Sequence, residues 1–140
     1  MKLKIKKLNQ SAKLPEYACN DDAGFDLFAT ETIEVKPHER VQIKTGLAMQ
    51  IPTGFVGLIW DKSGLSHNHG LKTLGGVVDS GYRGEIKVGL INLGTEKYTI
   101  EAGHKVAQMI IQKKEICEIE VVDELEESDR GESAFGSSGK

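Results

Sequence analysis

In the stretch "RVQIKTGLAMQI", residues 40–51, an apolar residue or a threonine stands at every second position from Val41 onward. This period of two is typical of a β-strand, because successive side chains point to opposite faces of a sheet. Further strand-like runs, bounded by Gly, Pro, Asp or Asn, recur along the chain: "GFDLFA", "IEVK", "GFVGLIW", "GEIKVGLINLG", "YTIEAGHKVAQMIIQ" and "CEIEVV". These signals predict an all-β fold.

Helical signals are weak by comparison. The best helical candidate is a turn or two near "SGLSHNHG". The 16 glycines stand mostly at strand ends, where corners and bulges fold a sheet back on itself. We therefore expect a jelly-roll-like β-barrel or sandwich. The run "KLKIKK", residues 2–7, predicts an edge strand with one solvated face.

The 140 residues suit a single domain followed by a short tail. We assign residues 1–125 to the β-barrel domain and residues 126–140 to a C-terminal arm. The acidic run "DELEESDR" leads into "RGESAFGSSGK", residues 130–140, which is rich in glycine and serine. Because such a composition buries little apolar surface, we expect the arm to be flexible.

The charge and the cysteines exclude several classes of partner. The formal net charge of −3 leaves no basic footprint for a nucleic-acid polymer. No segment approaches the roughly 18 consecutive apolar residues of a membrane helix, so we expect no membrane partner. Cys19 and Cys117 stand far apart without metal-ligand spacing, which favours two reduced thiols in a cytoplasmic protein.

The densest chemical signal is "GGVVDSGYRG", residues 75–84. Asp79 follows a short apolar run and precedes a glycine turn, so its carboxylate can be held at a strand end beside Tyr82. One acid placed near a nucleophilic water is the minimum requirement for general-base hydrolysis. The alternative is that Asp79 only caps a turn.

Three other features have a chemical and an ordinary interpretation. In "DKSGLS", residues 61–66, Lys62 and Ser63 precede the helical candidate and could cradle an anion, although an ordinary loop has the same composition. Gln108 stands alone among apolar strand residues, which suits either a site-facing amide or a solvated barrel face. His67 and His69 lack a third ligand nearby, so a turn or helix end is favoured over a zinc site.

Taken in order, the motifs resemble those of the trimeric dUTP diphosphatases, the dUTPase family. The resemblance extends from about residue 20 to the end of the chain. The five stretches that carry it are "AGFDLFA" (23–29), "DKSGLS" (61–66), "GGVVDSGYRG" (75–84), "AGHKVAQMII" (102–111) and "RGESAFGSSG" (130–139).

The resemblance implies a jelly-roll homotrimer whose three active sites each draw on all three chains. It implies hydrolysis of dUTP to dUMP and pyrophosphate with Mg²⁺, by attack of water on the α-phosphorus. This reaction removes dUTP from the nucleotide pool and supplies dUMP for thymidylate synthesis. The arm is expected to cross to another subunit and close over the nucleotide.

The resemblance also assigns roles to single residues. Asp79 is expected to activate the attacking water and to contact the 3'-hydroxyl, while Gln108 places the phosphates or that water. Tyr82 is expected to lie under the deoxyribose and exclude a 2'-hydroxyl. Backbone groups around Gly76, Val77 and Val78 are expected to bind uracil.

The remaining assignments concern the triphosphate and the metal. Lys62, Ser63 and Gly64 are expected to bind phosphate, Arg130 the distal phosphates, and Phe135 with the adjacent Gly136 the uracil ring. Magnesium is expected to be held by the substrate phosphates without a direct protein ligand. Asp26 is assigned to metal-bound waters or to local structure.

Several positions depart from the pattern of the family. Lys62 and Lys105 replace arginines, Asp61 replaces a proline, and further departures are Gly81, His104, Glu132 and Ala134. The sequence must also be weighed against a dCTP deaminase-related enzyme, but the strand position of its glutamate is occupied here by Gly89. A non-catalytic nucleotide-binding protein and a structural jelly-roll module are two more functions that the same fold could serve.

Overall fold

The computed structural model describes residues 1–132. Phe135 and Gly136, both predicted to contact uracil, lie outside the described residues. Within the described part, ten strands and one short helix follow one another. Their bounds are β1 Lys4–Lys7, β2 Phe25–Phe28, β3 Ile33–Val35, β4 Arg40–Gln50, β5 Phe55–Trp60, α1 Ser63–His69, β6 Leu71–Leu74, β7 Val77–Val78, β8 Glu85–Asn92, β9 Tyr98–Ile100 and β10 Lys105–Lys113.

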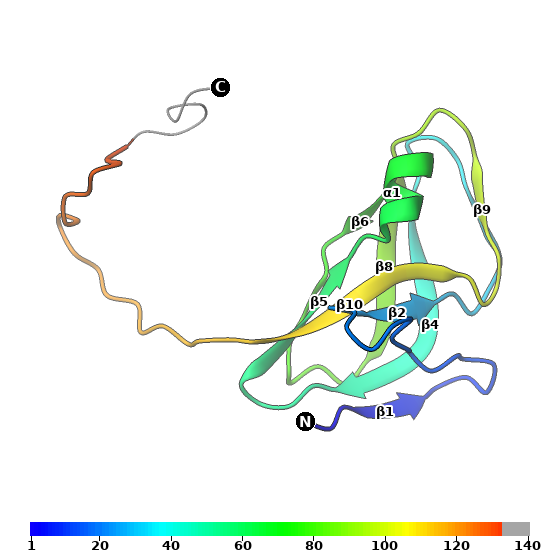
Figure 1. The fold of residues 1–140 in the computed structure, drawn as a ribbon, viewed down its shortest axis with the longest axis horizontal. Helices are drawn as coiled ribbons and strands as arrows, with labels where there is room; N and C mark the ends of the chain where they lie inside the picture. Colours follow the sequence, from blue (N-terminus) through cyan, green and yellow to red (C-terminus); the bar gives the residue numbers. More distant parts are fainter. Residues whose placement is uncertain (133–140) are drawn as a thin grey trace.

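The strands form two four-stranded antiparallel sheets, ordered β1-β4-β8-β6 and β2-β10-β5-β7, and a two-stranded ribbon, β3-β9. Figure 1 shows the strands gathered into one body, with α1 between β5 and β6 along the chain. The predicted all-β, jelly-roll-like fold is confirmed. The predicted edge strand is also confirmed, since β1 pairs with β4 alone. No helix within residues 1–132 is long and apolar enough to cross a membrane.

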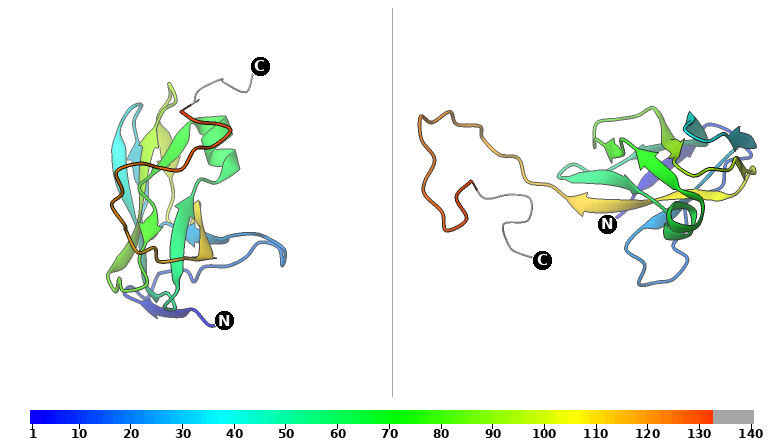
Figure 2. Two further views of the ribbon diagram at one scale, coloured as in Figure 1. Left: turned by 90° about the vertical axis from the view of Figure 1, so that its left-hand side faces the viewer. Right: turned by 90° about the horizontal axis from the view of Figure 1, so that it is seen from above.

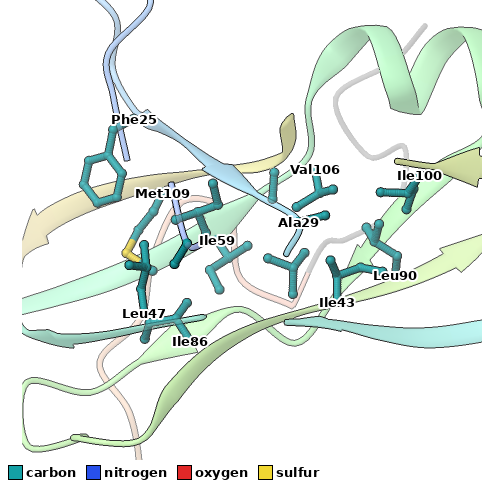
Figure 3. Close-up of a cluster of buried hydrophobic side chains, with 14 of the residues drawn as sticks. Phe25, Ala29, Ile43, Leu47, Ile59, Ile86, Leu90, Ile100, Val106 and Met109 are labelled. Atoms are coloured by element: carbon teal, nitrogen blue, oxygen red, sulfur yellow. The ribbon is translucent and has the colours of Figure 1, made fainter. Parts of the chain in front are cut away.

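The core lies between the two large sheets. Figure 3 shows Leu47 and Ile86 from one sheet facing Ile59 and Met109 from the other. The alternation in β4 carries this packing, because Ile43, Leu47 and Met49 are all at most 2% exposed. The same stretch therefore predicts both the strand and the face that it buries.

Gly46 lets β4 bend in its middle. The pairing of β4 with β8 shifts register between Lys44 and Ala48, and Gly46 has a φ of 67°. A Cβ at this position would lie 2.9 Å from Ala12 Cβ. Because both the backbone angle and the space exclude a side chain, glycine is required at this bulge.

The prediction of a strand over "CEIEVV", residues 117–122, is wrong for the described chain. After β10 ends at Lys113, residues 114–132 have no helix or strand and lead away from the barrel (Figures 1 and 2). Ile119 and Val121 are 90% and 93% exposed. A strand requires a neighbouring edge as well as an alternating pattern, and this segment meets none within residues 1–132.

Two smaller differences concern short elements. The strand β6, Leu71–Leu74, was not predicted, because its four residues are too few for a clear pattern. The run "YTIEAGHKVAQMIIQ" forms two strands, β9 and β10, which are separated by a turn at residues 101–104. The short helix α1 agrees with the predicted helical turn.

Candidate active site

A cavity of about 390 Å³ opens at the end of β7, where Asp79 follows the strand. Asp79 and Tyr82, which the sequence placed together, both line it. So do Gly76, Val77 and Val78, the residues expected to bind uracil. The remaining lining residues come from β4, β5 and β8 and were not predicted: Gln42, Ile59, Glu85, Ile86 and Lys87.

The backbone before β7 is held close to β5. The amide of Ile59 donates a hydrogen bond of 2.7 Å to the carbonyl of Gly76. Gly76 has a φ of 113°, and a Cβ there would lie 2.7 Å from the Ile59 carbonyl oxygen. Only glycine fits this approach. Because β7 is the last strand of its sheet, its outer edge faces no strand neighbour among the described residues.

The ring of Tyr82 has a defined place beside this edge. Its amide donates to the Asp79 carbonyl over 3.1 Å, and its hydroxyl donates to the Glu85 carbonyl over 3.1 Å. A Cβ on Gly84 would overlap the Tyr82 hydroxyl. Glycine at position 84 therefore makes the room in which the tyrosine ring lies.

The carboxylate of Asp79 is exposed to solvent. Within residues 1–132 its side-chain oxygens have no hydrogen-bond or ion-pair partner. Both oxygens can therefore accept a proton or bind water, which is the geometric requirement for a general base.

A second polar cluster surrounds Asp26 on β2. This carboxylate is only 1% exposed. Its Oδ1 accepts a hydrogen bond of 2.6 Å from Lys62 Nζ, and its Oδ2 lies 2.7 Å from Lys105 Nζ as an ion pair outside hydrogen-bond geometry. Two lysines from distant parts of the chain thus share one buried carboxylate.

The pKa shifts follow from these contacts. Burial raises the pKa of Asp26, but the contacts of Lys105 and Lys62 outweigh it and hold that pKa below the ordinary value. The contact with Asp26 in turn raises the pKa of Lys105. All three groups therefore remain charged at neutral pH.

Gln108 lies next to this cluster on β10, opposite Asp26 on β2 and Trp60 on β5. Its Nε2 donates a hydrogen bond of 2.9 Å to the backbone carbonyl of Asp61. Ser63 and Gly64 are exposed at the start of α1. The residues expected to handle phosphate are thus gathered around one loop.

The predicted site residues fall into two groups in a single chain. Lys62, Gln108 and Asp26 do not line the Asp79 cavity. Arg130 stands on the segment that leads away from the barrel (Figure 1). A complete site containing all of them requires a contribution from another chain or a large rearrangement of this one.

The same geometry bears on a deaminase and on a metal centre. A Cβ on Gly89 would lie 3.0 Å from the Leu74 carbonyl oxygen, so the strand position where deaminases carry a glutamate has little space here. His67 and His69 lie in the last turn of α1. Among residues 1–132, no three His, Cys, Asp or Glu side chains are grouped to hold a metal ion.

Known proteins match this chain along nearly its whole length. The family model described as dUTPase matches residues 10–139. A curated protein of Clostridium kluyveri, named deoxyuridine 5'-triphosphate nucleotidohydrolase, is 47% identical over 141 residues, which cover 99% of each chain.

Two solved structures match the fold. The dUTPase of Staphylococcus bacteriophage 80alpha, solved with dUpNHpp, has a TM-score of 0.93 at 33% identity and covers 99% of both chains. The dUTPase of phage phi11 of S. aureus has a TM-score of 0.83 at 30% identity, with 89% of this chain and 98% of that one covered. The second structure is described as coordinating a structural Mg(II) ion.

Proposed function

The chain belongs to the dUTPase family, and from that premise we propose that it hydrolyses dUTP to dUMP and pyrophosphate. The observation that carries the proposal is the cavity in which the unpartnered carboxylate of Asp79 stands beside the β7 edge and the Tyr82 ring. This cavity joins one proton acceptor to a surface suited to a planar base and its sugar.

Uracil is proposed to bind along the outer edge of β7. The base presents an N–H donor between two carbonyl acceptors, which matches the alternating groups of a strand edge. Gly76, Val77 and Val78 supply this backbone, and Tyr82 supports the deoxyribose. A close ring contact below C2' would leave no room for a 2'-hydroxyl, which would select dUTP over UTP.

In the proposed reaction, Asp79 accepts a proton from a water molecule that it holds by hydrogen bonding. The water oxygen forms a bond to the α-phosphorus, and the bond from that phosphorus to the bridging oxygen breaks. Pyrophosphate leaves with the electron pair of the broken bond. Gln108 orients the water or the phosphates through its amide, and the start of α1, with Lys62, Ser63 and Gly64, holds the phosphates.

Magnesium is proposed to enter with the triphosphate, where it neutralises charge on the phosphate oxygens. The donor set of the chain suits an ion held this way, since both oxygens of Asp26 are already opposite lysine ammonium groups. Asp26 is therefore assigned to local structure. Arg130, Phe135 and Gly136 of the arm are proposed to close over the nucleotide.

We further propose a homotrimer with shared sites. The two groups of site residues do not meet in one chain, and an apolar outer face on β5, β7 and β10 is left uncovered. On it, Trp60 and Val77 are 52% and 71% exposed, and Leu58 and Ile110 flank them. An exposed apolar face of this kind favours assembly.

The C-terminal segment supports the same assembly. Ile116, Ile119 and Leu125 are exposed on a segment that leaves the barrel, as expected if it packs on another subunit. The domain boundary near residue 125 and a cytoplasmic location, in keeping with the free thiols of Cys19 and Cys117, belong to the same proposal.

The first experiment measures pyrophosphate release from dUTP, dCTP, dTTP and UTP with magnesium, before and after chelation. Release from dUTP alone, abolished by the chelator, is the expected result. Absence of release from dUTP would refute the proposed function and favour a nucleotide-binding protein.

A subunit-mixing experiment tests the shared site. Asp79→Asn and Gln108→Ala chains are denatured, mixed in equal amounts and refolded together. If each site takes Asp79 and Gln108 from different chains, about one quarter of the sites regain both residues and activity returns. A mixture as inactive as either variant alone would show that one chain supplies both residues. Each variant refolded separately is the control.

A further inference from the structure

The side chain of Asp61 ties the loop before α1 to the neighbouring strand β6. Its Oδ1 accepts hydrogen bonds of 2.7 Å from both the amide and the hydroxyl of Thr73. Its Oδ2 accepts one of 2.6 Å from Lys72 Nζ. Three hydrogen bonds from two consecutive residues therefore fix this carboxylate and the backbone that carries it.

The backbone carbonyl of the same residue holds Gln108. The amide Nε2 of Gln108 donates to it over 2.9 Å. Because this bond uses the donor end of the side chain, the Oε1 end is left to accept a hydrogen bond from water. A Cβ at Gly24 would lie 3.2 Å from that Oε1, so the amide has little freedom on this side.

Asp61 remains ionised in this setting. Partial burial raises its pKa, but the hydrogen bonds from Lys72 and Thr73 outweigh burial and hold the pKa below the ordinary value. The three hydrogen bonds to the carboxylate therefore persist across the neutral range of pH.

We propose that Asp61 is a positioning residue for the reaction, because its carboxylate fixes the carbonyl that orients Gln108 and the loop that begins with Lys62. This inference rests on the proposed function for its effect on turnover. Asp61 itself lies outside the Asp79 cavity and needs no contact with substrate. It acts by limiting the directions in which the Gln108 amide can point.

The test is a double-mutant cycle between Asp61 and Gln108. Asp61→Ala is expected to lower kcat about 10- to 100-fold, since a misplacement near 1 Å costs up to about 100-fold. In the Gln108→Ala background the same change is expected to lower kcat less than about threefold, because the group being positioned is absent. Glu34→Gln, which breaks the exposed pair with Lys97, is the matched control and keeps wild-type kcat.

A second readout does not depend on turnover. The side-chain amide resonance of Gln108, identified by its loss in Gln108→Ala, is expected to shift in Asp61→Ala and to stay in place in Glu34→Gln. Should Asp61→Ala fail to fold, Thr73→Val and Asp61→Asn weaken the same link and carry the test, with the same resonance shift expected.

The outcomes separate the two proposals. Equal losses in the presence and absence of Gln108, or an unmoved amide resonance, would overturn the positioning role while leaving dUTP hydrolysis intact. A wild-type protein that releases no pyrophosphate, yet shows the resonance shift, would instead refute the proposed function and keep the link between Asp61 and Gln108.

Discussion

Two carboxylates near the candidate site have opposite surroundings. Asp79 is exposed at the end of β7 and has no side-chain partner within residues 1–132. Asp26 is 1% exposed, and lysine nitrogens lie 2.6 and 2.7 Å from its oxygens. Because cations nearby stabilise the charged form, Asp26 is a poor proton acceptor, whereas Asp79 keeps its lone pairs available. The partners of an acid, more than its place in a motif, indicate what it can do.

The largest expected effect breaks the comparison on the side of Asp79. Asp79→Asn is expected to lower kcat by about 10² to 10⁴, the usual contribution of a general base. The melting temperature is expected to stay at the wild-type value, because the exposed side chain contacts nothing that the amide would lose. Pyrophosphate release and thermal unfolding measure the two effects. Wild-type turnover in the variant would show that another group accepts the proton.

The next effect concerns the buried carboxylate. Asp26→Ala leaves the ammonium groups of Lys62 and Lys105 together without a counter-charge. We expect the free energy of unfolding to fall by about 2–4 kcal/mol, less than for a fully buried pair because both lysines retain contact with water. Urea unfolding at one fixed protein concentration measures it, so that any association is held constant.

Two further variants test the cause of this loss. Asp26→Ala combined with Lys105→Met is expected to recover part of the stability, because one unneutralised cation is removed. Glu34→Gln, at an exposed pair, is expected to leave the urea midpoint near wild type. A double variant as unstable as Asp26→Ala alone would assign the loss to packing instead of charge.

The two halves of the comparison were not equally predictable from the sequence. Asp79 could be placed because local signals suffice: a short apolar run, two preceding glycines and a glycine turn. The cluster around Asp26 could not, because its hydrogen bond with Lys62 joins residues 36 positions apart and depends on the order β2-β10-β5. The link from Asp61 to Gln108 was missed for the same reason.

The fold shows the same division. The alternation in β4 correctly predicts a strand and its buried face, since both properties are local. The same kind of pattern in residues 117–122 gave a wrong prediction, because pairing also depends on whether a sheet edge is present. Local periodicity describes what a segment can form, while the neighbouring elements decide whether it forms.

A smaller effect tests whether the Asp79 side works by shape, as the Asp26 side works by charge. Gly84→Ala places a methyl group where the Tyr82 hydroxyl lies, so the ring must move. The preference for dUTP over UTP, measured as a ratio of kcat/KM values, is expected to fall about 10- to 30-fold. Tyr82→Phe removes only the hydroxyl and is expected to keep the preference. Equal losses in both variants would assign selection to the hydrogen bond with Glu85.

The smallest expected effect is a pH dependence that belongs to Asp26. Its pKa in the folded chain lies below the ordinary 3.8. Its stabilising contribution is therefore complete above that value and is lost as the pH falls through it toward the folded pKa. For Lys105, whose folded pKa is raised above 10.5, the contribution is present below that pH and is lost as the pH rises through the folded value.

Urea midpoints between about pH 5 and pH 2 are expected to fall more steeply in the wild type than in Asp26→Asn, which cannot titrate at this position. Glu34 and Asp61, whose pKa values are also lowered, account for the slope that remains in the variant. A slope as steep in Asp26→Asn as in the wild type would mean that the lysines do not hold Asp26 ionised. The contrast between the saturated and the available carboxylate would then have to rest on burial alone, which by itself favours protonation of Asp26 and would make it a competing candidate for the base.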